Sequence, residues 1–193
     1  MPRPRLGGTA GNATLTRAVA AVLVLLLAAE GITILDLGGL RTPHMFIGLV
    51  LLGPLAVKLG STGYRMARYY GGAHPYREKG PPALPMRLLA PVLVAATVGV
   101  FASGIALLAA GHRSDLLLLA HKASFVVWSV AFAVHFLAYL PRVLRSLGED
   151  WTARRRRETP GSALRLGLLA LSTAGGLALA VALLGSITGW HGG

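Results

Sequence analysis

Five long apolar stretches, separated by segments rich in arginine, constrain the fold of this 193-residue chain more than any other feature. They cover residues 18–37, 44–63, 88–110, 116–140 and 164–187. A helix needs about 20 residues to cross the hydrocarbon core of a bilayer, and each stretch is close to that length. Because the stretches are continuously apolar rather than alternating, they predict helices and not barrel strands. The expected fold class is all-α, an integral membrane bundle of five transmembrane helices.

The basic residues predict the direction of these spans. The chain has 19 Lys and Arg against 7 Asp and Glu, a net charge of +12. Most of these cations lie in the N-terminal tail and in the connections after the second and fourth spans, whereas the opposite side receives only Arg41, Arg113 and Lys122. By the positive-inside rule, the N-terminus is cytoplasmic and the C-terminus lies outside the cell membrane. The arginine run at 154–157 then reads as a topological signal, with anionic lipid as an alternative partner and no nucleic acid expected.

This topology predicts four segments. They are a cytoplasmic tail at 1–17, a four-helix membrane core at 18–141, a basic cytoplasmic loop at 142–163, and a fifth helix with a short outer tail at 164–193. The first span could instead be a signal peptide, but Glu30 and Asp36 follow it without a convincing cleavage site. The chain has no Cys, which excludes a disulfide framework, an iron–sulfur cluster and covalent c-type haem.

Histidines are placed unevenly in the spans. His121 and His135 are 14 residues apart in the fourth span, almost four helical turns, so they lie near one face. His44 opens the second span, and Lys58 follows it at the same spacing. Since these two spans run in the same direction, His44 is level with His121 and Lys58 with His135. Imidazoles inside a membrane are rare and usually functional, and two that face each other can bind haem iron from both sides.

The segments HMFIGLVLLGPLAVKLGSTGYRMARYY and HKASFVVWSVAFAVHF resemble membrane-bound b-type cytochromes. This family includes the cytochrome b subunits of quinol-oxidising complexes, the ferric-reductase-like transmembrane proteins and small actinobacterial cytochrome b-like membrane proteins. The resemblance covers roughly residues 18–141, and Lys58 departs from it because the family has His there. It implies haem b held by His44 and His121, with a second haem at His135 opposite Lys58 or another ligand. It also implies electron transfer between a quinone or cytoplasmic donor and an outer acceptor, by a subunit of an oxidoreductase with a redox partner protein.

Each supporting residue has a second interpretation. Lys58 either ligates iron as a neutral amine or extends its ammonium to the inner headgroups, and Pro54 is expected to kink the helix before it. Gly48 and Gly104 either admit the edge of a haem or allow close helix packing. The candidates for binding haem propionates, or for ordinary anchoring at the interface, are Tyr64, Arg65 and Arg68 at the inner side and Arg41, Arg113 and Lys122 at the outer side.

Glu30 is the acid embedded in an apolar run. It either accepts a proton from a quinol or pairs with Arg41 or Lys122. A different class of function also fits the sequence, a cofactor-free scaffold or small-solute transporter subunit with a helix break at residues 53–54. No nucleotide-binding glycine motif and no hydrolytic carboxylate pair is present, so catalytic residues are not expected.

Overall fold

The computed structural model describes residues 8–150 and 161–190, and this part of the chain is helical with no strand. The helices, in chain order, are α1 (Gly8–Leu35), α2 (Leu37–Tyr70), α3 (His74–Glu78), α4 (Leu84–Ala110), α5 (Asp115–Asp150), α7 (Ser162–Ala182) and α8 (Leu184–Thr188). Five of them, α1, α2, α4, α5 and α7, are long and apolar enough to cross a membrane. The prediction of an all-α membrane bundle with five spans is confirmed. The arginines at 3, 5 and 154–157 lie outside the described residues.

The helices extend beyond the apolar stretches that predicted them. α1 begins at Gly8, before the expected span, and α5 continues to Asp150, into the segment 142–163 that was expected to be a loop. The hydropathy pattern marks only the part of a helix that lipid surrounds, and Arg, Leu and Glu beyond it favour helix as well. The helical content is therefore higher than the topology alone predicts.

A tight connection joins α1 to α2. The Asp36 carboxylate accepts a hydrogen bond from the backbone N–H of Gly39 at 3.1 Å, which caps the start of α2. The helix is interrupted at Leu40, whose φ of −109° and ψ of 19° are non-helical. Leu40 is the non-helical position inside α2, and the backbone stays helical through Pro54. The helix is therefore not broken at residues 53–54, and its non-helical position lies before His44. The bend expected at Pro54 stays a prediction.

The chain forms two compact units. The first combines residues 1–81 with 143–181, and so contains α1, α2, α3 and nearly all of α7. The second combines residues 82–142 with 182–193, and so contains α4, most of α5, and α8. The fifth span thus belongs to the same unit as the first two.

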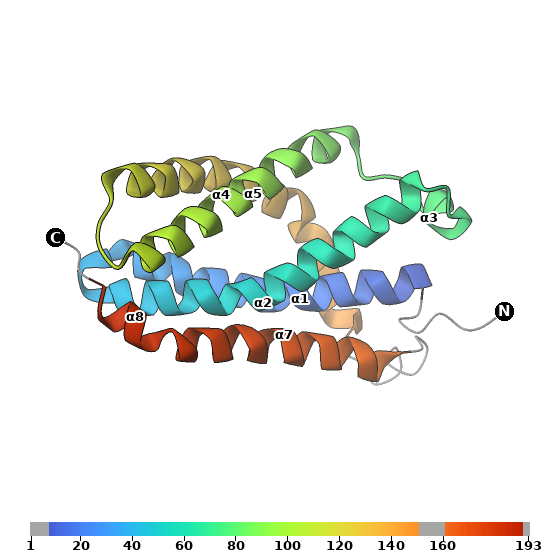
Figure 1. Ribbon diagram of the computed structural model, residues 1–193. Coiled ribbons are helices and arrows are strands. Elements are labelled where there is room, and N and C mark those ends of the chain that lie inside the picture. Colours follow the sequence, from blue (N-terminus) through green and yellow to red (C-terminus); the bar gives the residue numbers. More distant parts are fainter. Residues whose placement is uncertain (1–7, 151–160, 191–193) are drawn as a thin grey trace. The chain divides into compact units, whose positions relative to one another are not determined.

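In the first unit, α2 packs along α1 and against α7 (Figure 1). Val19 of α1 and Pro54 of α2 are completely enclosed. A Cβ atom on Gly176 would overlap the carbonyl of Val50, the group that loses its helical hydrogen bond because Pro54 has no N–H. A Cβ on Gly53 would likewise overlap the carbonyl of Ser172. Glycine at both positions lets the backbones of α2 and α7 touch, which is a common way of packing membrane helices.

In the second unit, α4 turns into α5 through Gly111, which takes a left-handed φ of 71° at the end of α4. The two helices approach closely at Gly99, where a Cβ would come within 2.6 Å of the Ser124 hydroxyl. Trp190, just after α8, donates its indole N–H to the carbonyl of Leu107 at 2.9 Å. This bond ties the end of the chain back to α4.

Candidate functional site

His44, near the start of α2, is held by two groups of α1 in the first unit. Its Nδ1 lies 3.0 Å from the Glu30 carboxylate and 3.0 Å from the Thr33 hydroxyl. The Thr33 hydroxyl donates its single hydrogen to the backbone carbonyl of Glu30 at 2.6 Å, so toward His44 it acts as an acceptor. His44 therefore carries its proton on Nδ1.

His121, in α5, is held in the same way by α4 in the second unit. Its Nδ1 lies 3.0 Å from the carbonyl of Val100 and 3.1 Å from the Ser103 hydroxyl. A carbonyl can only accept, and the Ser103 hydroxyl already points its hydrogen at the carbonyl of Gly99, 2.6 Å away. The proton of a neutral His121 is therefore also on Nδ1.

The two imidazoles thus share one protonation state. When Nδ1 carries the hydrogen of a neutral imidazole, the lone pair that can bind a metal is on Nε2. Metal-binding histidines commonly donate the other ring N–H to a carboxylate or to a backbone carbonyl, and this contact fixes the tautomer and the orientation of the ring. Glu30 supplies a partner of the first kind and Val100 of the second.

The two glycines predicted to lie near the histidines do so. Gly104 faces the His121 ring itself, whereas Gly48 faces Glu30, the partner of His44. A Cβ on Gly104 would come within 3.2 Å of Cε1 of His121, so the imidazole occupies the space that a side chain would need. A Cβ on Gly48 would meet the Glu30 carboxylate at 3.5 Å, an ordinary contact. Gly104 therefore sets the position of the His121 ring, whereas Gly48 leaves room for Glu30. Whether either also borders a haem stays a prediction.

Glu30 contacts His44, a partner that the sequence reasoning did not consider when it weighed Arg41, Lys122 or a quinol. The side chain is 14% exposed, and its second oxygen, Oε2, is buried without a hydrogen-bond partner in the described residues. A carboxylate at this depth is costly unless a partner offsets the desolvation. His44 is the partner that the structure shows for this carboxylate.

α5 separates aromatic from aliphatic side chains along its two faces. At about 100° per residue, His121, His135 and four rings between or beside them fall on one side of the helix. The rings of Phe125, Trp128, Phe132 and Phe136 stack in succession, with centroid distances of 6.2, 4.7 and 5.8 Å. These side chains are half-buried. The ring face therefore connects the levels of the two histidines.

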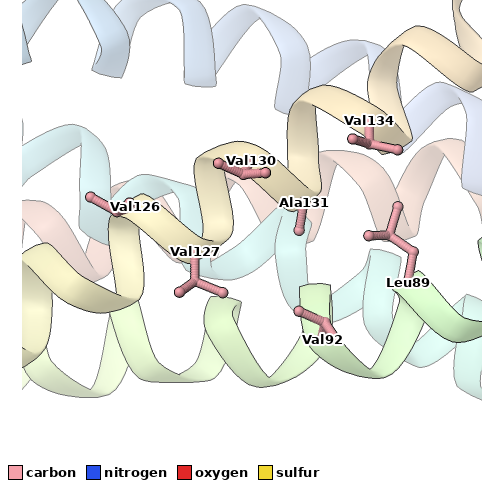
Figure 2. Close-up of a pocket in the computed structure, with 7 residues that line it drawn as sticks. All are labelled: Leu89, Val92, Val126, Val127, Val130, Ala131 and Val134. Atoms are coloured by element: carbon pink, nitrogen blue, oxygen red, sulfur yellow. The ribbon is translucent and has the colours of Figure 1, made fainter.

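The opposite face of α5 is aliphatic. Figure 2 shows a shallow groove along it, where valines of α5 lie opposite two side chains of α4. The groove is lined by Leu89, Val92, Val126, Val127, Val130, Ala131 and Val134. Since its walls offer no polar side chain, the groove suits acyl chains of lipid and not chemistry.

Lys58 and His135, which the 14-residue spacing predicts to be level with each other, have different surroundings. Lys58 donates from Nζ to the backbone carbonyl of Thr16 at 3.1 Å, a contact of α2 with α1. The His135 ring contacts Tyr139 of the same helix, with ring centroids 4.8 Å apart. The part of the chain that the structure describes contains no cluster of three His, Cys, Asp or Glu able to hold a bare metal ion. A haem differs in needing a single protein ligand on each side of its iron.

Tyr64 and Arg65, the predicted propionate partners, lie near α3 in the first unit. The Tyr64 ring meets that of Tyr76 edge-on at 6.0 Å. Among the candidates predicted for the outer side, Arg113 forms an ion pair with Asp115 at 2.9 Å. Nδ1 of the neighbouring His112 lies 2.7 Å from the Ala110 carbonyl. Lys122 is exposed.

No family model, curated protein or solved structure matches this chain. The sequence reasoning missed Thr33 and Ser103, which hold the two imidazoles. A hydroxyl residue inside an apolar span, one turn from an acid or beside a glycine, is the signal that could have drawn attention to them.

Proposed function

We propose that this chain is a membrane-bound b-type cytochrome in which His44 and His121 hold one haem b. The observation that carries the proposal is the matched state of the two imidazoles. Each lies on a membrane-spanning helix and has its Nδ1–H directed at protein acceptors, which places the lone pair on Nε2. When bound, the haem supplies an iron centre that accepts and releases one electron.

The donors and their surroundings fit this cofactor. Both histidines have the outer partners typical of metal ligands, and the glycine beside His121 leaves room for its ring. The aromatic face of α5 offers flat apolar surfaces next to His121, which suit a flat macrocycle. Glu30 contributes a negative charge beside one ligand, which raises the basicity of His44 and favours the oxidised iron.

One haem is proposed rather than two. Lys58 uses its Nζ to donate to Thr16, so the first unit gives it a role in joining α1 to α2. A second haem at His135 would need a partner ligand other than Lys58. From the arginine bias we infer that the N-terminus is cytoplasmic and that the haem lies near the outer face of the cell membrane. There His44 and His121 hold the haem for one-electron transfer between a quinone or cytoplasmic donor and an outer acceptor. A redox partner protein supplies or accepts the electrons.

The test is spectroscopic. Protein purified from haem-replete cells should show a Soret band, a sharp α-band on reduction and the signal of low-spin, bis-imidazole iron. His44→Ala and His121→Ala should each abolish that low-spin signal. His112→Ala removes an imidazole next to the carbonyl of Ala110 and serves as the matched control, with an unchanged spectrum. A colourless wild-type preparation would refute the proposal and favour the cofactor-free scaffold or transporter.

Counting haems gives a second measurement. Wild type should contain one haem per chain, and Lys58→Ala should contain the same amount. A loss of half the haem in Lys58→Ala would instead assign this lysine to a second site.

A further inference from the structure

A polar contact network joins α1 to α2 where α1 begins and α2 approaches its end. Asn12, 7% exposed, donates its amide to the carbonyl of Ser61 at 3.1 Å, and the Thr16 hydroxyl reaches the Ser61 hydroxyl at 3.1 Å. Lys58 donates to the carbonyl of Thr16. The network fixes the two helices in register. Arg17 directly follows Thr16, and Arg65 lies one helical turn after Ser61, so both arginines are close in sequence to residues of the network.

α3 folds back onto the same end of α2 and adds a third segment (Figure 1). Tyr76 is 8% exposed and packs edge-on against Tyr64. Lys79 follows α3 directly. Its pKa is lowered first by burial and then by the positive charges of Arg65 and Arg17, so its surroundings are basic. Three segments distant in the sequence thus bring Arg17, Lys58, Arg65 and Lys79 together.

The acids whose side chains the structure describes do not neutralise three of these cations, Lys58, Arg65 and Lys79. Glu78, the acid nearest to Lys79 in sequence, contacts His74 at 3.5 Å. Lys58, Arg65 and Lys79 make no ion pair with the side chains described in residues 8–141 and 161–190, and Lys58 uses one of its three N–H donors there. Like charges held close together raise the free energy of the unit unless an anion binds between them.

We propose that Arg17, Lys58, Arg65 and Lys79 form a binding site for the phosphate of an anionic phospholipid. The position favours a lipid over a soluble anion. The site lies at the end of a membrane-spanning helix, beside tyrosines such as Tyr64 and Tyr70 that are more than half exposed and typical of the membrane interface. Basic pockets between spans on the cytoplasmic side bind the head groups of acidic lipids. The proposal does not depend on haem.

The experiment uses the full chain in nanodiscs of phosphatidylcholine with increasing phosphatidylglycerol, and counts retained phosphatidylglycerol by native mass spectrometry. Arg65→Gln with Lys79→Gln removes two cations of the site. Arg77→Gln with Arg87→Gln is the matched control, because it removes the same charge from the same basic stretch of the sequence, residues 65–87. The first pair should weaken binding roughly 30-fold, since each cation near an anionic surface contributes about fivefold, whereas the control pair should change it less than threefold.

Three outcomes would overturn the proposal. The first is an equal loss in both double variants, which would mean that only the overall surface charge attracts lipid. The second is unchanged binding in Arg65→Gln with Lys79→Gln. The third is competition by millimolar inorganic phosphate, or its binding in pure phosphatidylcholine discs, which would assign the site to a free phosphate. Circular dichroism of each variant establishes that it is folded.

Discussion

The imidazole of His44, in the first unit, and that of His121, in the second, are held by the same hydroxyl arrangement but by partners of different charge. In each, a Thr or Ser of the neighbouring helix donates its hydrogen to a backbone carbonyl and accepts from Nδ1. The second partner is the Glu30 carboxylate for His44 and the neutral Val100 carbonyl for His121.

This difference teaches that the orientation of a ring and its electron-donating strength have separate causes. Two neutral groups fixed by α4, the Ser103 hydroxyl and the Val100 carbonyl, hold Nδ1 of His121. Glu30 adds charge, which strengthens His44 as an electron donor. The surroundings of His44 in the first unit and of His121 in the second can therefore be altered separately by mutation.

The largest effect is expected from a substitution that disturbs the packing of α2 on α7, which affects the first unit only. Gly176→Ala places a Cβ against the Val50 carbonyl, and neither backbone can yield without moving α2 relative to α7. Overpacking of this kind costs about 1–3 kcal/mol of stability. We expect a lower midpoint in detergent-induced or thermal unfolding and a loss of His44-dependent haem binding.

The neighbouring glycine provides the control for that variant. A Cβ on Gly175 would have nothing within 4 Å, so Gly175→Ala should leave the midpoint unchanged or slightly raised. Equal destabilisation by both substitutions would show that helix propensity or lipid contact, and not the α2–α7 approach, controls the first unit.

The next effect tests the charge difference directly. Glu30→Gln keeps an oxygen that can accept from His44 but removes the carboxylate charge. The midpoint reduction potential of the haem should rise, and haem affinity should fall about 10- to 100-fold, as outer-partner substitutions at metal sites typically do. Redox titration followed at the α-band measures the potential. Glu78→Gln, which changes an exposed acid, is the control, and an unchanged potential in Glu30→Gln would mean that Glu30 does not act on the ligand.

The sequence predicted the spans better than it predicted these contacts. Long apolar runs identify membrane helices because the bilayer imposes a length, and all five were found. The spacing of His121 and His135 placed both on one face, where the half-buried rings of α5 also lie. Hydropathy gives no information about which helix packs on which, so the grouping of α7 with α1 and α2 could not be predicted.

Side-chain partners were harder still. Lys58 and His135 are level in the sequence ladder, but the hydrogen bond from Lys58 is to α1, because Thr16 offers a carbonyl at that depth. Glu30 was weighed against Arg41 and Lys122, while His44 lies across a connection that returns α2 beside α1. The kink at Leu40 was missed because no proline or glycine occupies that position, and Pro54 drew the prediction instead.

A smaller effect separates the glycines beside the two histidines. Gly104→Ala would press on the His121 ring at 3.2 Å and displace it by a few tenths of an ångström, whereas Gly48→Ala makes an ordinary 3.5 Å contact with Glu30. Haem affinity should fall roughly fivefold in Gly104→Ala, equivalent to about 1 kcal/mol, and stay within twofold in Gly48→Ala. Haem transfer to apomyoglobin measures both. A larger loss in Gly48→Ala than in Gly104→Ala would contradict the assignment of these glycines.

The smallest effect tests the feature that the halves share. Thr33→Val and Ser103→Ala each remove a hydroxyl acceptor while the second Nδ1 partner remains. A hydrogen bond of this kind contributes about 0.5–1.5 kcal/mol net, and because the second Nδ1 partner remains, each variant should lose haem affinity near the lower end of that range, about two- to threefold. Because the two hydroxyls play one role, the losses should agree within twofold, and the electron paramagnetic resonance signal should broaden in both as the rings gain freedom. A loss confined to Thr33→Val would mean that Val100 alone orients His121, and that the hydroxyl matters only where a carboxylate stands beside it.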